Sequence, residues 1–359
     1  MNVFHKPLEA EHSLPTDKHQ RPLWLWPIYI GLACYTLVLI LLGLISAFAP
    51  STSIQLDFLR TAYWLFAWPL PLAFIVAVVL RSRWLVSLLI VPLIAFMVYN
   101  LPYLLPKSIP VPDNSTEIKV LTFNFLARDV HKIVAGSDLL ASSGADIIAL
   151  QEFGISAAEY LDGFLAEHYP YQALDSQPGR FNYVRGQGVF SRFPILESEY
   201  WQYTNLPESH GNQRVVLSID GQSVVFYNIH PWPPFDFNGL HIGFQEKDAI
   251  ANRGAIEDIV QRTQAETDPV IVVGDFNTGD QFASYGLFTS ILHDSYRESG
   301  QGMGYSYPSC GIGPLPALIR LDYILFSDPI VANHATVLDS CGISDHKTTM
   351  ATLSLPAKP

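Results

Sequence analysis

The fold is decided by a stretch of eight residues, VIVVGDFN at positions 270–277. Its β-branched first half predicts a buried strand that begins after Pro269 and ends at Asp275. Alternate residues of an extended chain share a face, so Asp275 and Asn277 are expected to point the same way. Asp and Asn are also common turn formers, so an ordinary turn is the alternative interpretation of this pair.

Other expected strands in the C-terminal part of the chain also carry a polar residue at one end. Besides Asp275 and Asn277, these residues are Asn124, Glu152, His230 and Asp322. A single polar residue at a strand end is most often a cap or a turn residue. Several together predict a site assembled along one edge of a sheet.

From Glu117 onward, short apolar strands alternate with helical stretches, which predicts an α/β domain. Roughly 240 residues of this kind are enough to bury one sizeable core. We expect a helix that ends near residue 144, a second helix at 245–264, and strands at 118–124, 146–150, 188–191, 215–219, 224–230, 269–275, 321–326 and 348–355.

The first third of the chain carries three apolar runs, at residues 23–48, 62–80 and 85–105. Each run is close to the roughly 20 residues that a helix needs to cross a bilayer, and none contains a charged side chain. Three runs in series disfavour the alternative of a signal peptide followed by buried core helices. The run ends carry the aromatic residues of an interfacial belt, namely Trp24, Trp26, Trp64, Trp84 and Tyr103. We therefore expect three transmembrane helices.

The cations beside these runs predict their orientation. Lys6, Lys18 and Arg21 precede the first run, while Arg81 and Arg83 lie between the second and the third. Both segments would face the cytoplasm, which makes the chain a multi-pass protein of the cell membrane with an extracytoplasmic C-terminal domain. The predicted organisation is a tail at 1–22, a membrane domain at 23–105, a proline-rich linker at 106–116 and a catalytic domain at 117–359.

The charge of the chain is concentrated in its C-terminal part. Of 21 basic and 33 acidic residues, 15 and 29 follow residue 105. Nucleic-acid binding depends on Lys and Arg contacts to phosphate, so an acidic domain makes nucleic acid a less favoured partner. A local basic cleft would restore it.

The chain contains three cysteines, and their spacing does not suggest a zinc site. Cys34 lies inside the first apolar run, whereas Cys310 and Cys341 flank the final strands. If the domain lies outside the cytoplasm, a disulfide between Cys310 and Cys341 is permitted, and a pair of ordinary buried thiols is the alternative. The sequence leaves this question open.

Seven short motifs in the C-terminal part occur in an order that resembles the endonuclease/exonuclease/phosphatase family. They are LTFN at 121–124, LQE at 150–152, GVFSR at 188–192, YNIHP at 227–231, GDFN at 274–277, LDY at 321–323 and SDH at 344–346. Each motif is weak alone, but seven in register are specific. The resemblance spans residues 118–355 and implies a four-layer α/β/β/α sandwich of the DNase I type, here preceded by three transmembrane helices.

The residue types also suit phosphoester cleavage, which needs a hard cation, an activated water and donors for charged oxygens. Mg²⁺, or Mn²⁺ in its place, prefers carboxylate oxygens and keeps several waters. Glu152 is the predicted metal ligand, with Asn124 beside it on a neighbouring strand. The alternative for Glu152 is a cap of the following helix. The resemblance adds Asp345 as a carboxylate near the metal.

The predicted catalytic residues activate the attacking water and contact the phosphoryl group. Asp275 would orient or deprotonate the attacking water, and Asn277 would donate to a phosphoryl oxygen. His346 is expected to pair with Asp322, which would fix its tautomer and stabilise its cationic form. The resemblance assigns to His230 a contact with the phosphate or help to the leaving group.

Three further residues are predicted to bind the substrate, namely Asn228, Arg192 and Arg214. For the two arginines, a structural ion pair is the alternative interpretation. Four histidines have no motif to support a role: His210, His241, His293 and His334.

The loop after His230 distinguishes this chain from part of the family. It reads PWPPFDF at 231–237, where the abasic-site endonuclease branch carries a Pro-Asn motif. Trp232, Phe235 and Phe237 would either enter a bilayer interface or pack under the following helix.

We therefore predict a membrane-anchored, metal-dependent phosphoesterase. Its partners would be the lipid bilayer and a phosphate-containing substrate, lipid-linked or small, and no protein partner is predicted. An extracytoplasmic nuclease and a catalytically inactive binding domain are the alternatives.

Overall fold

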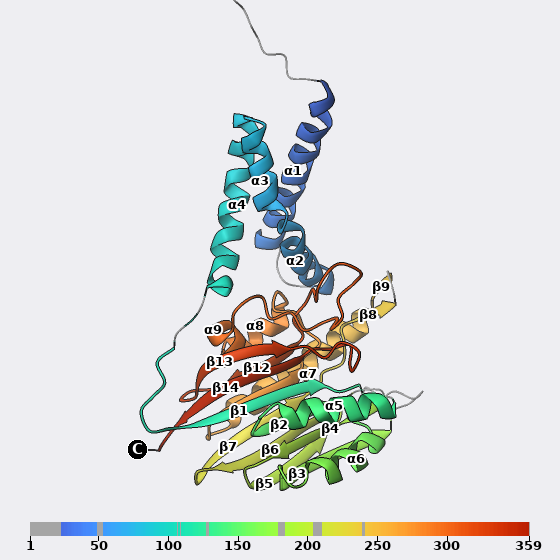
Figure 1. Ribbon diagram of the computed structural model, residues 1–359, viewed down its shortest axis with the longest axis vertical. Helices are drawn as coiled ribbons and strands as arrows, with labels where there is room; N and C mark the ends of the chain where they lie inside the picture. The colour runs from blue at the N-terminus through green and yellow to red at the C-terminus, as the bar shows by residue number, and fades with distance from the viewer. Residues whose placement is uncertain are drawn as a thin grey trace, which may run out of the picture.

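The structure is a computed structural model that describes residues 23–48, 53–105, 107, 109–126, 129–178, 184–203, 210–238 and 241–358. The expected N-terminal tail, residues 1–22, lies outside these residues. A group of apolar helices occupies one end of the molecule, and an α/β domain occupies the other (Figure 1).

The N-terminal part consists of helices. The short 3-10 turn η1 (Leu23–Leu25) is followed by α1 (Trp26–Phe48), α2 (Ile54–Ala67), α3 (Leu70–Val79) and α4 (Arg83–Leu104). Within the described residues, three segments are long and apolar enough to cross a membrane: Leu23–Phe48, Ile54–Val79 and Arg83–Leu104.

The second of these segments starts earlier than expected. We predicted an uncharged run from residue 62 to 80, but α2 begins at Ile54 and includes Asp57 and Arg60. The Nη1 atom of Arg60 lies 3.2 Å from the Oδ1 atom of Asp57, and both side chains are largely shielded from solvent. This pairing reduces the cost of desolvating two charges. The helix then breaks near Pro69, which has no backbone N–H to donate.

The C-terminal domain is built on two sheets of six strands. The strands of the first sheet are β1 (Ser115–Asn124), β2 (Ile147–Gln151), β3 (Tyr171–Pro178), β4 (Val184–Ser191), β13 (Val331–Leu338) and β14 (Thr348–Pro356). Those of the second are β5 (Ile195–Trp201), β6 (Asn212–Ile219), β7 (Gln222–Ile229), β10 (Val270–Asp275), β11 (His293–Asp294) and β12 (Asp322–Phe326). Their orders are β13-β14-β1-β2-β4-β3 and β11-β12-β10-β7-β6-β5. A separate hairpin consists of β8 (Phe235–Asn238) and β9 (His241–Phe244).

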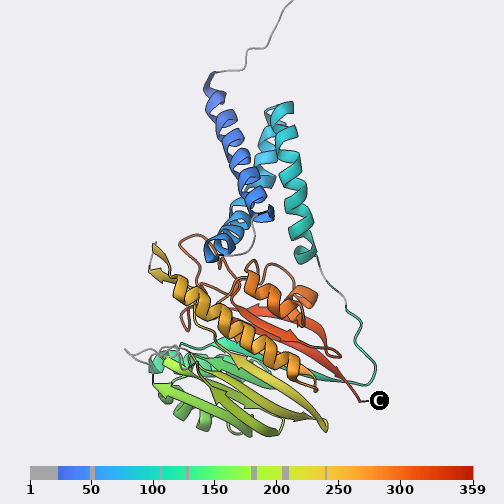
Figure 2. The same cartoon turned by 180° about the vertical axis from the view of Figure 1, so that it is seen from behind.

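Helices cover the outer faces of both sheets. They are α5 (Val130–Ser142), α6 (Ile155–Leu165), α7 (Glu246–Ala265), α8 (Ala283–Thr289) and α9 (Ser295–Ser299). In Figure 1, α5 and α6 lie against the first sheet, and Figure 2 shows α7 running across the second. The predicted DNase I-like α/β/β/α sandwich is thereby confirmed.

The alternation of side chains along the strands explains these layers. Val120 of β1 and Val273 of β10 belong to the core between the two sheets. Leu121, which follows Val120, points outward and packs beneath α5 and α6. Because the period is two, the inner face continues to Asn124 in β1 and to Asp275 in β10. The polar strand ends therefore face the space between the sheets.

The strand register brings these ends to one edge of the sandwich. Asn124 is the partner of Gln151 in the parallel pair of β1 and β2. Asp275 is the partner of Asp322 in the antiparallel pair of β10 and β12. The predicted site residues that end the inner faces of their strands are thus neighbours in space.

The helical end and the α/β domain are in contact. Phe235, at the start of β8, is buried in a cluster with Ile54 of α2 and Phe282, against which Ala249 of α7 also packs. Packing therefore accounts for Phe235, and the partner includes an apolar helix as well as α7. The side chain of Phe237 lies outside the described residues.

Cys310 and Cys341 form a disulfide, which answers the question that the sequence left open. Next to it, the amide of Ser309 donates to the carbonyl oxygen of Asp345 at 2.7 Å. The disulfide therefore ties the loop around Cys310 to the loop that carries the SDH motif.

Candidate active site

The last part of β10 requires glycine at position 274. Gly274 has a φ of 139°, which L side chains rarely adopt. A Cβ atom at this position would lie 2.0 Å from the carbonyl oxygen of Ile229 on β7. The ends of β7 and β10 can therefore approach closely, which brings His230 next to Asp275.

Asp275 is the centre of the resulting cluster and is almost completely buried. Its Oδ2 atom accepts a hydrogen bond from Nδ2 of Asn124 at 3.0 Å. The same oxygen lies 3.4 Å from Nε2 of His230 and 3.5 Å from Nε2 of His346. Burial alone would raise the pKa of Asp275, but the charges and hydrogen bonds of His346 and His230 outweigh burial and lower that pKa. Asp275 is therefore a carboxylate at neutral pH.

His346 is held in place by Asp322, as the sequence predicted. Its Nδ1 atom lies 2.9 Å from Oδ2 of Asp322, and both residues are buried. Burial lowers the pKa of His346, but the carboxylates of Asp322 and Asp275 outweigh this effect and raise the pKa well above its ordinary value. The pair thus holds a cationic imidazole whose Nε2 lies toward Asp275.

Glu152 and Asn124 offer hard oxygen atoms at the same edge. The Nδ2 atom of Asn124 donates to Oε1 of Glu152 at 3.1 Å, while Oδ1 of Asn124 is buried with no hydrogen-bond partner among the described residues. Such an atom is rare in native proteins unless an ion or a water completes it. Burial raises the pKa of Glu152, and the charge of Asp345 raises it further. These acids and the unpaired amide oxygen fit a hard divalent cation, which would favour their ionised forms.

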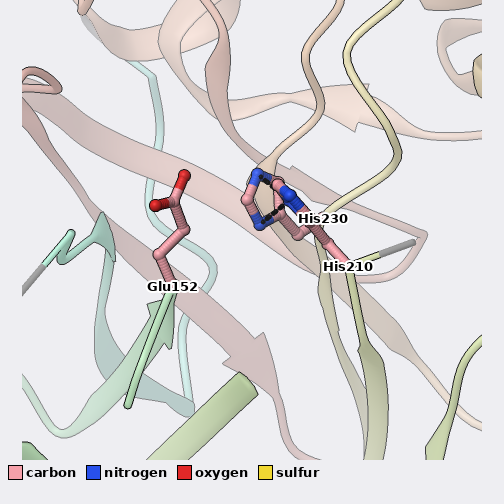
Figure 3. Close-up of side chains that lie close together, drawn as sticks. All are labelled: Glu152, His210 and His230. Atoms are coloured by element: carbon pink, nitrogen blue, oxygen red, sulfur yellow. Dashed lines mark hydrogen bonds between the residues drawn. The ribbon is translucent and has the colours of Figure 1, made fainter. Parts of the chain in front are cut away.

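His210 joins the site, although no sequence motif supported it. Figure 3 shows its ring against that of His230, with the carboxylate of Glu152 opposite the two imidazoles. The ring centroids of the histidines are 3.8 Å apart. A ligand atom of each of the three residues lies within 4.8 Å of the others, so they form a second group that could hold a metal ion, beside Asp275, Asp322 and His346.

Strand register is the signal that could have found His210. The turn at Asp220-Gly221 joins two strands that we expected, and it fixes their pairing. Extending this register places His210 opposite the residues that follow β7, including His230. Motifs alone do not reveal this position.

Tyr307 is a second residue of the site that no sequence motif indicated. Its ring centroid lies 4.9 Å from that of His346. Burial raises the pKa of Tyr307 to about 12, and the nearby acids Asp345, Asp275 and Glu152 contribute to the rise. Tyr307 therefore remains protonated and lines the acidic side of the cluster.

Asn277 and Asn228 take different places. Asn277 follows Asp275 in the turn, where its amide N–H donates to Oδ1 of Asp275 at 2.9 Å and its Nδ2 donates to the carbonyl of Pro231. Asn228 is fully buried, and its side chain bonds Gln151 and the carbonyl oxygen of Leu150. Asn228 therefore links the two sheets beneath the site, whereas Asn277 is only partly buried.

The structure brings neither predicted arginine to the cluster. Arg192 follows β4 at the opposite end of the sheet and pairs with Asp146 at 2.9 Å. Arg214 pairs with Glu266 at 2.7 Å on the α7 side of the second sheet, where Tyr227 also donates to Glu266. Both contacts are the structural ion pairs that were the alternative interpretation.

The residue types of this cluster are those that hydrolysis of a charged ester uses. At one edge of the sandwich lie an ionised carboxylate, a paired cationic imidazole and several oxygen atoms that could bind a metal ion. Two facing sheets with such an edge define a DNase I-like sandwich with a candidate metal centre. The chain belongs to the endonuclease/exonuclease/phosphatase family, whose match covers residues 121–346.

Several solved structures share the fold. An endonuclease/exonuclease/phosphatase from Bacteroides vulgatus shares 17% identity at a TM-score of 0.52, over 67% of this chain and 99% of that one. TDP2 from D. rerio, complexed with a single-strand DNA product, shares 18% at 0.53, over 66% and 99%. A third structure, the family protein from Beutenbergia cavernae, shares 17% at 0.52, over 68% and 72%. No curated protein matches the sequence. At these identities the likeness establishes the fold.

Proposed function

We propose that this chain hydrolyses a lipid-linked or small phosphoester or diphosphate at the outer face of a membrane, with the help of Mg²⁺ or Mn²⁺. The observation that carries the proposal is the contact between the site loop and an apolar helix. The loop that starts at His230 reaches α2 within five residues, where Phe235 packs on Ile54. A substrate resident in the bilayer would therefore lie close to the catalytic residues.

A cavity beside this loop supports a lipid substrate. It has a volume of about 430 Å³ and lies between α2 and α7. Its lining includes the apolar Ile54, Phe282 and exposed Ile250 and the acidic Asp57 and Glu246. Such a mixed lining suits an amphiphile. The predicted catalytic residues lie outside the cavity, so it would hold a part of the substrate remote from the reacting bond.

The charge of the C-terminal domain supports a substrate other than nucleic acid. The disulfide supports a location of that domain at the outer side of the membrane. The excess of acids in the C-terminal domain disfavours a polyanion that needs many phosphate contacts. The disulfide between Cys310 and Cys341 suits an oxidising compartment. The apolar helices account for membrane association.

The residues of the cluster can perform the steps of an in-line hydrolysis. A divalent ion held by Glu152, Asn124 and Asp345 would neutralise charge on the phosphoryl oxygens. Asp275 would orient a water molecule and accept its proton at Oδ2. The cationic His346, held by Asp322, would stabilise charge that develops in the transition state.

Two further side chains would contact the substrate. The side-chain amide of Asn277 donates one hydrogen to the carbonyl oxygen of Pro231. Its second hydrogen would be donated to a phosphoryl oxygen. His230 would hold the oxygen of the leaving group, and its neighbour His210 would fix the orientation of its ring.

The test is a substrate panel with the full-length protein in lipid nanodiscs. The panel contains polyprenyl diphosphate, glycerophospholipids, sphingomyelin, inositol phosphates and single- and double-stranded DNA, each with Mg²⁺, Mn²⁺ or EDTA. We expect metal-dependent release from a lipid or small phosphate ester, and its loss in Asp275→Asn. The control His334→Gln changes an exposed histidine on β13 and should leave the rate unchanged.

The outcomes separate the alternatives. Turnover of DNA alone, weakened steeply by salt, would overturn the lipid proposal in favour of a nuclease. Failure to turn over any member of the panel, in the presence of either metal, would favour an inactive binding domain.

A further inference from the structure

The apolar helices contact the α/β domain at a second place, far in sequence from Phe235. The glycine-rich segment Gly300–Tyr307, here called the coupling segment, lies against the end of α4. The amide of Gly302 donates to the carbonyl oxygen of Tyr103 at 2.6 Å. The Nε2 atom of Gln301 donates to the carbonyl oxygen of Leu104 at 3.2 Å. These bonds use the backbone acceptors at the end of a helix, which otherwise lack partners.

Side chains reinforce this contact just before the coupling segment. The guanidinium of Arg297, in α9, lies 3.9 Å from the ring centroid of Tyr103 and forms an ion pair with Asp280. Its side chain is largely buried, and burial lowers the pKa of Arg297 to about 10. Lys107, which follows α4, donates to the carbonyl oxygen of Arg297. A buried cation between an aromatic ring and a carboxylate is costly to move.

Gln281 provides a third connection, from the turn before α8. Its Oε1 atom accepts from the indole N–H of Trp64 in α2 at 3.1 Å, and its Nε2 donates to the hydroxyl of Tyr99 in α4. The rings of Trp64 and Tyr99 stack with centroids 3.7 Å apart. One polar side chain of the α/β domain thus joins two apolar helices.

The other end of the coupling segment enters the candidate active site. The Oγ atom of Ser306 accepts from the amides of Leu321 and Asp322, at 3.1 and 3.3 Å. The carbonyl oxygen of Ser306 accepts from the amide of Lys347, next to His346, at 2.8 Å. Tyr307 packs on the ring of His346 itself. Ser306 and Tyr307 therefore support both members of the Asp322–His346 pair.

The sequence of the coupling segment makes its anchoring matter. It contains Gly300, Gly302 and Gly304, and the latter two have φ values of 92° and 73°. Glycines lose more conformational freedom on ordering than other residues, so such a segment is intrinsically mobile. Contacts with α4 restrict it at Gly302, four residues before Ser306.

We propose that the apolar helices are a structural part of the active site, because their contacts with the coupling segment position Ser306 and Tyr307 against Asp322 and His346. Arg297 and Gln281 are the positioning residues that hold the contact. The expected effect on kcat rests on the proposed function. The expected effect on the order of the Asp322–His346 pair does not.

The test uses full-length protein in nanodiscs and two variants, Arg297→Gln and the milder Gln281→Leu. The matched control is Arg262→Gln, because Arg262 lies 4.4 Å from the ring centroid of Trp201 and pairs with Asp258, away from the apolar helices. Hydrogen exchange is measured by mass spectrometry on peptides that cover residues 300–308, 320–323 and 344–348. Turnover is measured with bis(p-nitrophenyl) phosphate, a soluble probe that needs no membrane to reach the site.

We expect faster exchange in all three peptides for both variants, and wild-type exchange for the control. The kcat should fall about ten- to hundredfold while KM changes little, because the loss concerns alignment of catalytic groups. Faster exchange confined to the peptide 300–308, or unchanged kcat in both variants, would overturn the proposal. If the wild type turns over no substrate, the proposed function fails, and the exchange at 320–323 and 344–348 still decides whether the helices position the site.

Discussion

Substitution of Gly274 by alanine should damage the site without removing any functional group. The new Cβ would lie 2.0 Å from the carbonyl oxygen of Ile229, and ordinary contact begins at 3.4 Å. The two atoms must therefore move apart by 1.4 Å, and the partner is backbone that cannot rotate away. The φ of 139° adds strain of about 1–3 kcal/mol for a residue with a side chain.

The displacement falls next to the catalytic centre, because Asp275 follows Gly274 and His230 follows Ile229. A misplacement of about 1 Å can cost about a hundredfold in rate, so we expect kcat to fall by at least about that factor. The unfolding temperature should fall as well. Both are measured on the full-length protein, by turnover of bis(p-nitrophenyl) phosphate and by a thermal unfolding scan at matched detergent concentration.

The matched control is Gly254→Ala in α7. A Cβ atom there meets nothing within 4 Å, and the helical backbone suits alanine. This change should stabilise the protein by about 0.5–1 kcal/mol and leave kcat unchanged. Wild-type turnover and unfolding temperature in Gly274→Ala would refute the close approach of β7 and β10 as the origin of the site.

Variants of the cluster and of the disulfide beside it test the site in three further ways. Asp322→Asn removes the carboxylate that does most to raise the pKa of His346. Activity that needs the cationic His346 is present below that pKa and is lost as pH rises through it. The basic limb of the kcat profile should therefore move to lower pH, and kcat at neutral pH should fall about 10²- to 10⁴-fold. An unmoved basic limb would contradict this assignment. Glu152→Gln should raise the Mg²⁺ concentration for half-maximal activity by at least about tenfold, and Mn²⁺ binding followed by electron paramagnetic resonance should weaken in parallel; unchanged Mn²⁺ binding would remove Glu152 from the ligand set. The double variant Cys310→Ser, Cys341→Ser opens a link between residues 31 positions apart and should cost about 2–5 kcal/mol of stability, seen as a lower unfolding temperature that reductant no longer changes; a wild-type unfolding temperature would show that the loops need no covalent tie.

The sequence predicted those parts of the fold whose residues are buried. The strand that ends at Asp275 is buried throughout and begins with four β-branched residues, so its composition alone identifies it. The expected strands in the middle of both sheets are present for the same reason. Edge strands were missed: β5 is mostly exposed and carries Glu197 and Glu199, so no apolar alternation marks it. The start of α2 was missed because Asp57 and Arg60 hide their charges in a pair that sequence patterns do not reveal.

The same division holds for the candidate site. Residues at the ends of buried strands, such as Asp275 and Asp322, could be predicted because strand periodicity fixes the face on which they lie. Tyr307 could not, because it sits in a loop whose position depends on hydrogen bonds to distant segments. Arg192 and Arg214 were predicted to bind substrate but form ion pairs instead. The sequence does not distinguish an arginine that binds substrate from one that forms an ion pair within the protein.

We propose that the cluster around Asp275 is a metal-dependent hydrolytic site. The most direct measurement is the rate of bis(p-nitrophenyl) phosphate hydrolysis by the full-length protein, with Mg²⁺ and with EDTA, for the wild type and Asp275→Asn. We expect turnover with Mg²⁺ that EDTA abolishes and that falls at least about a hundredfold in the variant. Equal turnover in EDTA, or in Asp275→Asn, would contradict it.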